Sequence, residues 1–204
     1  KFIISSNGFV EYLPEVKPEN NPHWCVYTSS YDRGLLNLLE IWPEVRKAVP
    51  DAELHCFYGW QLFYTFYKGN PERMAWMNKM NELMKLPGIT HHDRVPQEEM
   101  ERWYKKCGIF AYSSHFREIN CISAIKAQAF GAVPVVTNFG ALKTTVQSGL
   151  KTDGEIYENV ALAPETKEAY QIALITALKD PKWQEEQRKI GMEYAKKFDW
   201  DFVV

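Results

Sequence analysis

A polar turn between two apolar segments carries the residues best suited to chemistry. Residues 113–138 read SSHFREINCISAIKAQAFGAVPVVTN, with Glu118 as an isolated acid in the turn. A helical run rich in small residues follows, Gly131 breaks it, and Pro134 opens a β-branched strand. The first N–H groups of a helix lack partners and its dipole favours negative charge, so this pattern predicts an anion site. Small residues let the helix pack close to a sheet, which favours a nucleotide or phosphate pocket over a plain core.

A second candidate lies in SSYDRG at residues 29–34, between an apolar run and a helical pattern. Asp32 is predicted to cap the helix. Arg33 at the start of the helix suits a diphosphate, which a guanidinium binds through two parallel hydrogen bonds. Gly34 permits close backbone approach to a ligand. An exposed arginine in a capped turn is the alternative.

His115, Arg117 and Glu118 form the strongest polar cluster in the sequence. An ionised carboxylate only accepts hydrogen bonds, so Glu118 suits the donor hydroxyls of a sugar or ribose. A carboxylate that caps the following helix is the alternative. Lys126 comes eight residues later, which places it on roughly the same side of one continuous helix. A surface lysine is the ordinary interpretation of Lys126.

Aromatic and glycine residues follow the second predicted strand as Tyr58, Gly59 and Trp60. A glycine here can mark a loop beneath a ligand, and the indole of Trp60 could stack on a planar group. An ordinary turn with a packed tryptophan is the alternative.

The pair His91 and His92 invites a metal interpretation. Neighbouring side chains on a strand point to opposite faces, so the two imidazoles cannot easily bind one ion. The end of this strand, at Arg94 and Val95, is instead expected to border the pocket and to offer backbone groups to a base.

The acids Asp199 and Asp201 form a D-x-D pair, which in some transferases holds a divalent ion on a diphosphate. At this place in the chain, a helix-capping aspartate is the favoured interpretation. The sequence has no G-x-S-x-G, H-E-x-x-H or G-x-x-x-x-G-K-[ST] motif, which disfavours serine hydrolases, zincins and P-loop proteins.

The composition limits the class of protein. The chain has 204 residues and a formal net charge of −2, which suits one domain with a sizeable core and gives no field favouring nucleic acid or an anionic membrane. No apolar stretch reaches the length of a membrane span, and the first residues lack a signal-peptide pattern. Without a C-x-x-C pair, the four cysteines predict reduced core thiols and a cytoplasmic location. They are Cys25, Cys56, Cys107 and Cys121.

Strand-like and helix-like segments alternate from residue 24 onward. The predicted strands are 24–28, 52–58, 89–92, 108–112 and 133–137. The predicted helices are 33–49, 71–86, 98–106, one after Glu118, one from about 141, 166–179 and 182–197. This alternation predicts a doubly wound α/β domain with a mainly parallel sheet, whose ligands bind beyond the carboxyl ends of the strands. Residues 1–23, with an Asn7-Gly8 turn and three prolines, are expected to form a linker that leads into a domain over residues 24–197.

In order and spacing, these pieces resemble the C-terminal, donor-binding half of a GT-B glycosyltransferase of the retaining group 1 kind. Asn7-Gly8 resembles the turn that ends the interdomain linker, and Arg33-Gly34 the basic residue and glycine that open the first helix. Residues 114–134 are similar to the family's E-x7-E region. The ending FDWD resembles the start of the helix that crosses back to the other half, so residues 198–204 are expected to begin it.

The resemblance implies a Rossmann-like half that binds a nucleotide-sugar. It implies that Arg33 and the N–H groups of the helix after Glu118 stabilise the leaving diphosphate electrostatically, with no metal or other cofactor. It also implies that Glu118 orients the transferred sugar. Arg33 and Glu118 are thus the expected catalytic residues. The expected donor-binding residues are Gly34, Tyr58, Gly59, Arg94, Val95, His115, Ile119, Asn120, Cys121, Ile122 and Lys126, with residues 119–122 acting mainly through their backbone.

Two positions depart from the family pattern. Lys126 stands where the family has its second acid, which commonly holds the ribose hydroxyls. Lys126 is therefore expected to pair with Glu118 or to approach a phosphate. Thr28, Ser29 and Ser30 stand where the family has another diphosphate-binding arginine.

The length also implies a missing partner, because a complete enzyme of this fold has an N-terminal domain that binds the acceptor. The chain is expected to be one part of a larger polypeptide. Two other functions remain open: a non-catalytic binding or scaffold module with this fold, and one half of a nucleotide-sugar epimerase.

Overall fold

A six-stranded sheet forms the centre of the computed structural model, which describes residues 20–198. Its strands are β1 (Asn21–Tyr27), β2 (Glu53–Phe57), β3 (Ile89–Asp93), β4 (Cys107–Tyr112), β5 (Val133–Thr137) and β6 (Leu150–Thr152). They lie in the order β3-β2-β1-β4-β5-β6 and every neighbouring pair is parallel. The prediction of a doubly wound, parallel α/β sheet is confirmed. The order reverses between β1 and β4, where ligands bind in such sheets.

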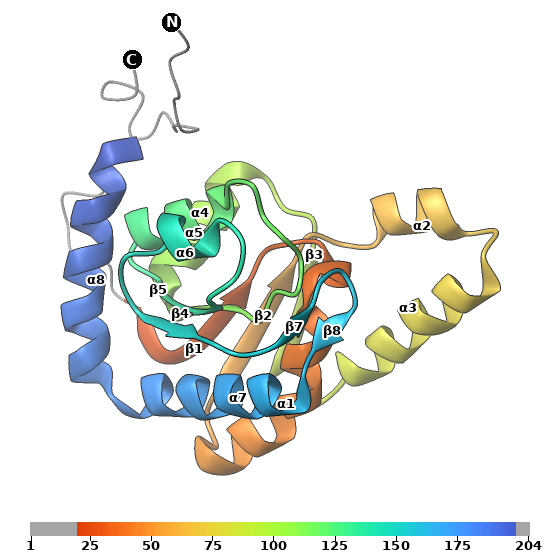
Figure 1. The fold of residues 1–204 in the computed structure, drawn as a ribbon, viewed down its shortest axis with the longest axis horizontal. Helices are drawn as coiled ribbons and strands as arrows, with labels where there is room; N and C mark the ends of the chain where they lie inside the picture. The colour runs from red at the N-terminus through yellow and green to blue at the C-terminus, as the bar shows by residue number, and fades with distance from the viewer. Residues whose placement is uncertain (1–19, 199–204) are drawn as a thin grey trace, which may run out of the picture.

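Helices cover both faces of the sheet (Figure 1). The helices are α1 (Leu35–Ala48), α2 (Gln61–Tyr67), α3 (Pro71–Leu83), α4 (Gln97–Lys106), α5 (Ile122–Ala129), α6 (Leu142–Thr145), α7 (Pro164–Lys179) and α8 (Pro181–Ala195). In Figure 1, α1 and α7 lie on one side of the sheet, and α4 and α5 lie on the other. Short 3-10 turns, Tyr31–Arg33 and Lys196–Phe198, precede α1 and follow α8.

The central strands are the most deeply buried part of the chain. Every residue of β4 and of β5 is buried, as expected for parallel strands covered on both faces. On α1, apolar residues recur at helical spacing and bury one face against the sheet. All four cysteines are free and buried in this core, so the prediction of core thiols is confirmed.

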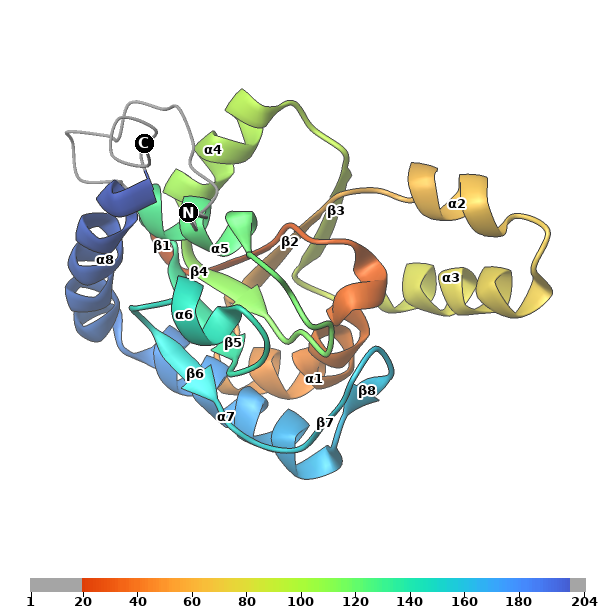
Figure 2. The ribbon, with the colours of Figure 1, turned by 45° about the horizontal axis from the view of Figure 1, so that its top comes forward.

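Helices α2 and α3 form an arm that projects beyond the body of the domain (Figure 2). No helix is predicted from the sequence where α2 lies. On α2, Phe63 alone is buried, whereas Leu62, Tyr64 and Phe66 are exposed. Because apolar residues occur on all sides of this short helix, its sequence has no amphipathic pattern.

Several predicted boundaries differ from the structure. The first strand begins at Asn21, before the predicted start at Trp24, and the helix expected from about residue 141 has only four residues. The short strands β6, β7 (Ile156–Tyr157) and β8 (Ala161–Leu162) are absent from the prediction, because two or three residues carry no periodic pattern. The linker turn at Asn7-Gly8 and the acids Asp199 and Asp201 lie outside the described residues.

None of the helices within residues 20–198 has the length and apolar character needed to cross a membrane.

Candidate functional site

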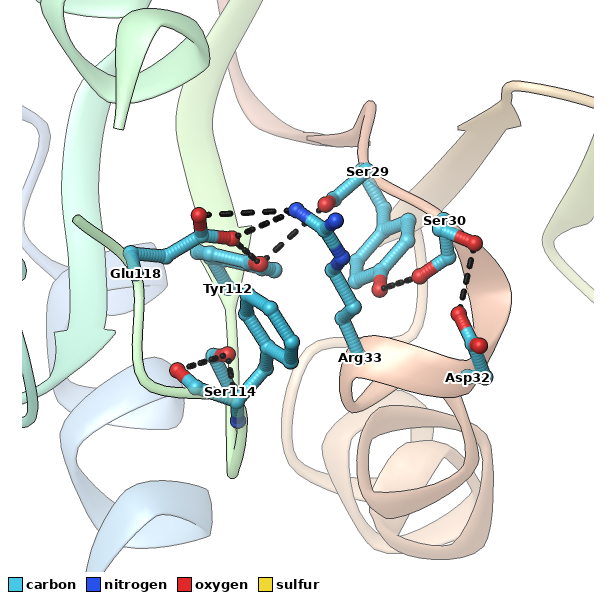
Figure 3. A network of polar contacts seen from close by, with 9 residues as sticks. Ser29, Ser30, Asp32, Arg33, Tyr112, Ser114 and Glu118 are labelled. Atoms are coloured by element: carbon cyan, nitrogen blue, oxygen red, sulfur yellow. Dashed lines mark hydrogen bonds and ion pairs between the residues drawn. The ribbon is translucent and has the colours of Figure 1, made fainter. Parts of the chain in front are cut away.

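An ion pair joins the two polar turns that the sequence singles out. Arg33 Nη1 lies 3.2 Å from Glu118 Oε1 and 3.4 Å from Glu118 Oε2. Figure 3 shows the two side chains facing each other from turns beside the ends of β1 and β4. The Glu118 side chain is only 10% exposed and that of Arg33 37%. The two residues expected to be catalytic therefore meet at the point where the strand order reverses.

The guanidinium of Arg33 has two further features. It lies over the ring of Phe116, 4.1 Å from the ring centre, which adds a cation–π contact. Burial lowers the pKa of Arg33, but the nearby Glu118 carboxylate outweighs this and the net shift is upward. Arg33 is therefore a permanent cation, partly open to solvent, that a phosphate could reach.

Backbone geometry at Gly34 places Arg33. Gly34 has a φ of +130° and separates the turn Tyr31–Arg33 from α1. A Cβ on Gly34 would lie 2.3 Å from the carbonyl oxygen of Ser113. The close approach expected of Gly34 is thus to the protein's own backbone.

Asp32 does not cap α1, contrary to the prediction. It lies inside the 3-10 turn, the residue before α1 is Gly34, and the Asp32 carboxylate accepts a hydrogen bond from the Ser30 hydroxyl at 2.5 Å. The prediction overlooked the extra turn between β1 and α1.

His115 is committed to holding the two turns together. Its Nε2 lies 3.1 Å from the carbonyl oxygen of Asp32, and its Nδ1 lies 3.3 Å from Nδ2 of Asn37. Since the carbonyl only accepts and the amide nitrogen only donates, the neutral imidazole carries its proton on Nε2. Burial lowers the pKa of His115, which favours this neutral form. The ring therefore fixes the turn that carries Arg33, and both of its nitrogens are occupied.

Tyr112, which the sequence did not single out, holds Glu118 from the other side. The Tyr112 hydroxyl donates to Glu118 Oε1 at 2.6 Å and lies 3.1 Å from the Ser29 hydroxyl (Figure 3). Tyr112 is fully buried at the end of β4, so in the sequence it has the character of a core strand residue. Only its place at a carboxyl end could have drawn attention to it.

The turn that carries Glu118 is braced by the segment after β5. The Glu118 carbonyl accepts a hydrogen bond from the backbone N–H of Ala141 at 2.8 Å. Gly140, with a φ of +55°, lies so close that a Cβ there would be 2.9 Å from the Glu118 nitrogen. Glu118 therefore does not cap α5, and its carboxylate points to Arg33 and Tyr112.

Helix α5 begins later than expected, at Ile122. Glu118 and Lys126 therefore do not share one helix, and the spacing argument that placed them on one side is wrong. Cys121 precedes the first turn, which has no side-chain cap. Burial raises the pKa of Cys121 to about 12, so its sulfur remains a thiol.

The apolar side chains beside the site are unusually open to solvent. Ile119 is 96% exposed and Ile122 is 43% exposed, next to Glu118 and at the start of α5. Exposed apolar residues that flank a polar site are typical of surfaces that contact a ligand or another domain.

A cavity of about 440 Å³ lies beyond the ends of β1, β2 and β3. Thr28 lines it from the end of β1, which continues into Ser29 and the ion pair. The structure thus brings Tyr58, Arg94 and Val95, three of the residues expected to bind the donor, to one cavity. Its other lining residues are Phe57, Leu62, Pro96, Gln97 and Met100.

The backbone beside this cavity is held in unusual conformations. Tyr58 has a φ of 116° and Asp93 a φ of 59°, and a Cβ on Gly59 would overlap the Asp93 carboxylate. Such conformations cost free energy and cluster at ligand sites. The N–H of Gly59 donates to the Tyr31 hydroxyl, so this N–H is bonded to the protein's own side chain.

The two neighbouring histidines on β3 point to different surroundings, as predicted. His91 packs beside Tyr31, whereas His92 stacks on Phe57 with ring centres 4.4 Å apart. In the described part of the chain, no three His, Cys, Asp or Glu side chains are grouped to hold a metal ion.

Comparison with known families gives one match. The model of the family "Glycosyl transferases group 1" matches residues 22–180, which include the ion pair, the cavity and all of the sheet except the first residue of β1. Among curated proteins, no sequence gives a significant match.

Solved structures share the fold at low sequence identity. The structure of a GtfA/B complex superposes with a TM-score of 0.71 at 12% identity, over 96% of this chain and 37% of that one. Sucrose-phosphate synthase from Thermosynechococcus elongatus gives 0.67 at 20% identity, over 88% of this chain and 42% of that one. HepE from Anabaena, solved with UDP and glucose, gives a TM-score of 0.66 at 11% identity, over 87% of this chain and 44% of that one. The chain thus spans less than half of each of these proteins.

Proposed function

Because the chain belongs to the group 1 glycosyl transferases, we propose that it binds the nucleotide-sugar donor of a sugar transfer that retains the anomeric configuration. The observation that carries the proposal is the Arg33–Glu118 pair at the switch point of the sheet. A cation and an acceptor-only carboxylate, side by side, match the two parts of a nucleotide-sugar that meet at the scissile bond.

Each part of the donor has a partner of suitable chemistry. The diphosphate would draw Arg33 from Glu118 and would face the start of α5, where backbone N–H groups and the helix dipole favour negative charge. The base would enter the cavity bordered by Tyr58, Arg94 and Val95. Glu118 would then accept hydrogen bonds from the sugar hydroxyls.

In the proposed reaction, the bond between the anomeric carbon and the diphosphate oxygen breaks, and negative charge develops on the diphosphate. The acceptor oxygen bonds to the anomeric carbon on the same face, and its proton passes to the departing diphosphate. Arg33 and the N–H groups of α5 would stabilise that charge without a metal, because preorganised donors cost no reorganisation at that moment. The acceptor would be held by a further domain of a longer polypeptide, a proposal supported by the coverage of less than half of the related structures. The exposed Ile119 and Ile122 would face that domain.

The proposal includes a cytoplasmic role in glycan biosynthesis. Four free, buried thiols suit a reducing compartment.

A non-catalytic binding module is the second candidate. Two observations favour it: Lys126 stands at the position of the family's second acid, and Arg33 is already paired with Glu118. A module of this kind would keep the pair as a structural contact.

A binding experiment separates the two candidates. The 204-residue chain is titrated by calorimetry with UDP, GDP, UDP-glucose, UDP-N-acetylglucosamine and GDP-mannose. Saturable binding of one nucleotide-sugar and its nucleoside diphosphate is expected for the donor site. A chain that binds none of the five compounds overturns the proposed donor site and leaves the structural module.

A further inference from the structure

The hydroxyl of Tyr112 has two partners on opposite sides of the switch point. It donates to Glu118 Oε1 at 2.6 Å and lies 3.1 Å from Oγ of Ser29, which follows β1. Since the phenol has one proton and gives it to the carboxylate, Ser29 donates to the phenol oxygen. A short O–H···O⁻ bond of this kind is among the stronger hydrogen bonds in proteins.

The ring itself has little freedom to move. Tyr112 has no exposed surface, its ring meets Tyr27 edge-on at 5.7 Å, and it lies 5.8 Å from the ring of Phe110. Burial raises the pKa of Tyr112, so the hydroxyl keeps its proton at neutral pH. The donor to Glu118 is therefore both fixed in place and always protonated.

The two oxygens of Glu118 are not equivalent. Oε1 accepts hydrogen bonds from the Tyr112 hydroxyl at 2.6 Å and from Arg33 at 3.2 Å. Of these two donors, only Arg33 reaches Oε2, at 3.4 Å. If a diphosphate takes Arg33, as the proposed function requires, Tyr112 still holds Oε1 and leaves Oε2 to a new donor. A carboxylate that is only 10% exposed would be costly to leave without any donor.

We propose that Tyr112 is a positioning residue that holds Glu118 by Oε1 and so aims Oε2 at a hydroxyl of the donor sugar. The inference rests on the proposed function. It adds that the selectivity for the sugar depends on an uncharged donor at the end of β4, which acts after Arg33 has moved to the diphosphate. Fixing such a group through packing and a supporting hydrogen bond is how precise sites are held.

The test compares Tyr112→Phe with wild type, using the nucleotide-sugar and nucleoside diphosphate that wild type binds in the panel above. Tyr112→Phe keeps the ring and removes the hydrogen bond to the carboxylate. We expect diphosphate affinity within about twofold of wild type and nucleotide-sugar affinity lower by about tenfold. Tyr194→Phe is the matched control, because it removes one tyrosine hydroxyl, on α8, which donates to the Thr144 carbonyl at 2.8 Å. It should leave both affinities unchanged.

A double variant tests whether Tyr112 acts through Glu118. If it does, Tyr112→Phe combined with Glu118→Gln binds the nucleotide-sugar no more weakly than Glu118→Gln alone. Additive losses, or an equal loss for both ligands in Tyr112→Phe, overturn the positioning role.

The outcomes separate this inference from the proposed function. A wild-type chain that binds no nucleotide removes the proposed function, and the inference with it. If wild type binds both ligands and Tyr112→Phe binds them with the same affinities, the inference is overturned and the proposed function stands. Should Tyr112→Phe fail to fold, Ser29→Ala is used instead, because it removes the hydrogen bond from Ser29 to the Tyr112 hydroxyl. Ser29→Ala should then weaken the nucleotide-sugar by about threefold and spare the diphosphate, and an equal effect on both ligands contradicts the inference.

Discussion

Gly34 lies against Ser113 so closely that a Cβ on Gly34 would be 2.3 Å from the Ser113 carbonyl oxygen. This contact joins the turn that carries Arg33 to the turn that carries Glu118. The Ser113 hydroxyl reinforces it by donating to the Gly34 carbonyl at 2.9 Å. The geometry of the ion pair therefore depends on the absence of a side chain at residue 34.

Gly34→Ala is expected to destabilise the fold and to displace Arg33. The φ of +130° is strained for alanine, and the added methyl group must push the two turns apart, so we expect a loss of about 2–4 kcal/mol in the free energy of unfolding. Urea unfolding measures it. Gly69→Ala is the matched control, because a Cβ there meets nothing within 4 Å. Equal stability of the two variants would contradict the role of this contact.

The sheet was predictable because its strands have strong local patterns. The β5 strand, Val133–Thr137, has the predicted bounds, and β4 begins one residue earlier than predicted. Short apolar runs, at residues 109–112 next to Gly108 and at 132–136 next to Gly131, predict buried strands without reference to the rest of the chain. The arm was not predictable in the same way, because α2 has no amphipathic pattern.

The site was only partly predictable, for a different reason. Arg33 and Glu118 stand out because a charged residue in a turn beside a helix suggests chemistry. That they bind each other depends on the strand order, which brings together residues 85 positions apart in the chain. Tyr112 has the composition of the core, and its partner Ser29 is 83 positions away. No local pattern encodes such a contact.

Arg33→Ala is expected to weaken the binding of a nucleoside diphosphate by about 1–3 kcal/mol, the range for a lost charge-assisted hydrogen bond. Calorimetry with UDP and GDP measures the change. Arg73→Ala is the control, because Arg73 on α3 also lies over an aromatic ring, 5.3 Å from the ring centre of Tyr67, and belongs to the projecting arm and not to the turns of the ion pair. Unchanged affinity in Arg33→Ala would remove Arg33 from the site.

Glu118→Gln is expected to affect the affinities for the nucleoside diphosphate and for the nucleotide-sugar differently. The amide keeps the shape of the side chain but releases Arg33 from its ion pair, so diphosphate affinity should stay the same or rise by about threefold. Nucleotide-sugar affinity should fall by about fivefold or more, because an amide is a weaker acceptor of a sugar hydroxyl than a carboxylate. Calorimetry on both ligands measures this, with Glu158→Gln as the exposed control. Equal weakening of both ligands would show that Glu118 does not contact the sugar.

Acid is expected to destabilise the domain through His55, a buried histidine of β2 that contacts β3. His55 Nδ1 lies 3.0 Å from His92 Nε2, and its ring packs 4.4 Å from that of Trp103. Burial, helped by the positive charge of His92 and Lys106, lowers the pKa of His55 from 6.5 to about 4. The unfolded chain binds this proton more readily than the folded protein does. The contribution of neutral His55 to the free energy of unfolding is therefore fully present above pH 6.5 and is lost as the pH falls toward 4.

The size of the effect follows from that pKa difference. Between pH 7 and pH 5, His55 should account for about 2 kcal/mol of lost stability. His55→Gln removes the titrating group, so its free energy of unfolding should fall less over this range than that of wild type, by about this amount. Urea unfolding at the two pH values measures the difference, and His23→Gln, at a partly exposed histidine paired with Asp51, is the control. Parallel pH curves for wild type and His55→Gln would mean that the pKa of His55 is the same in the folded and unfolded protein, which contradicts the lowering by burial.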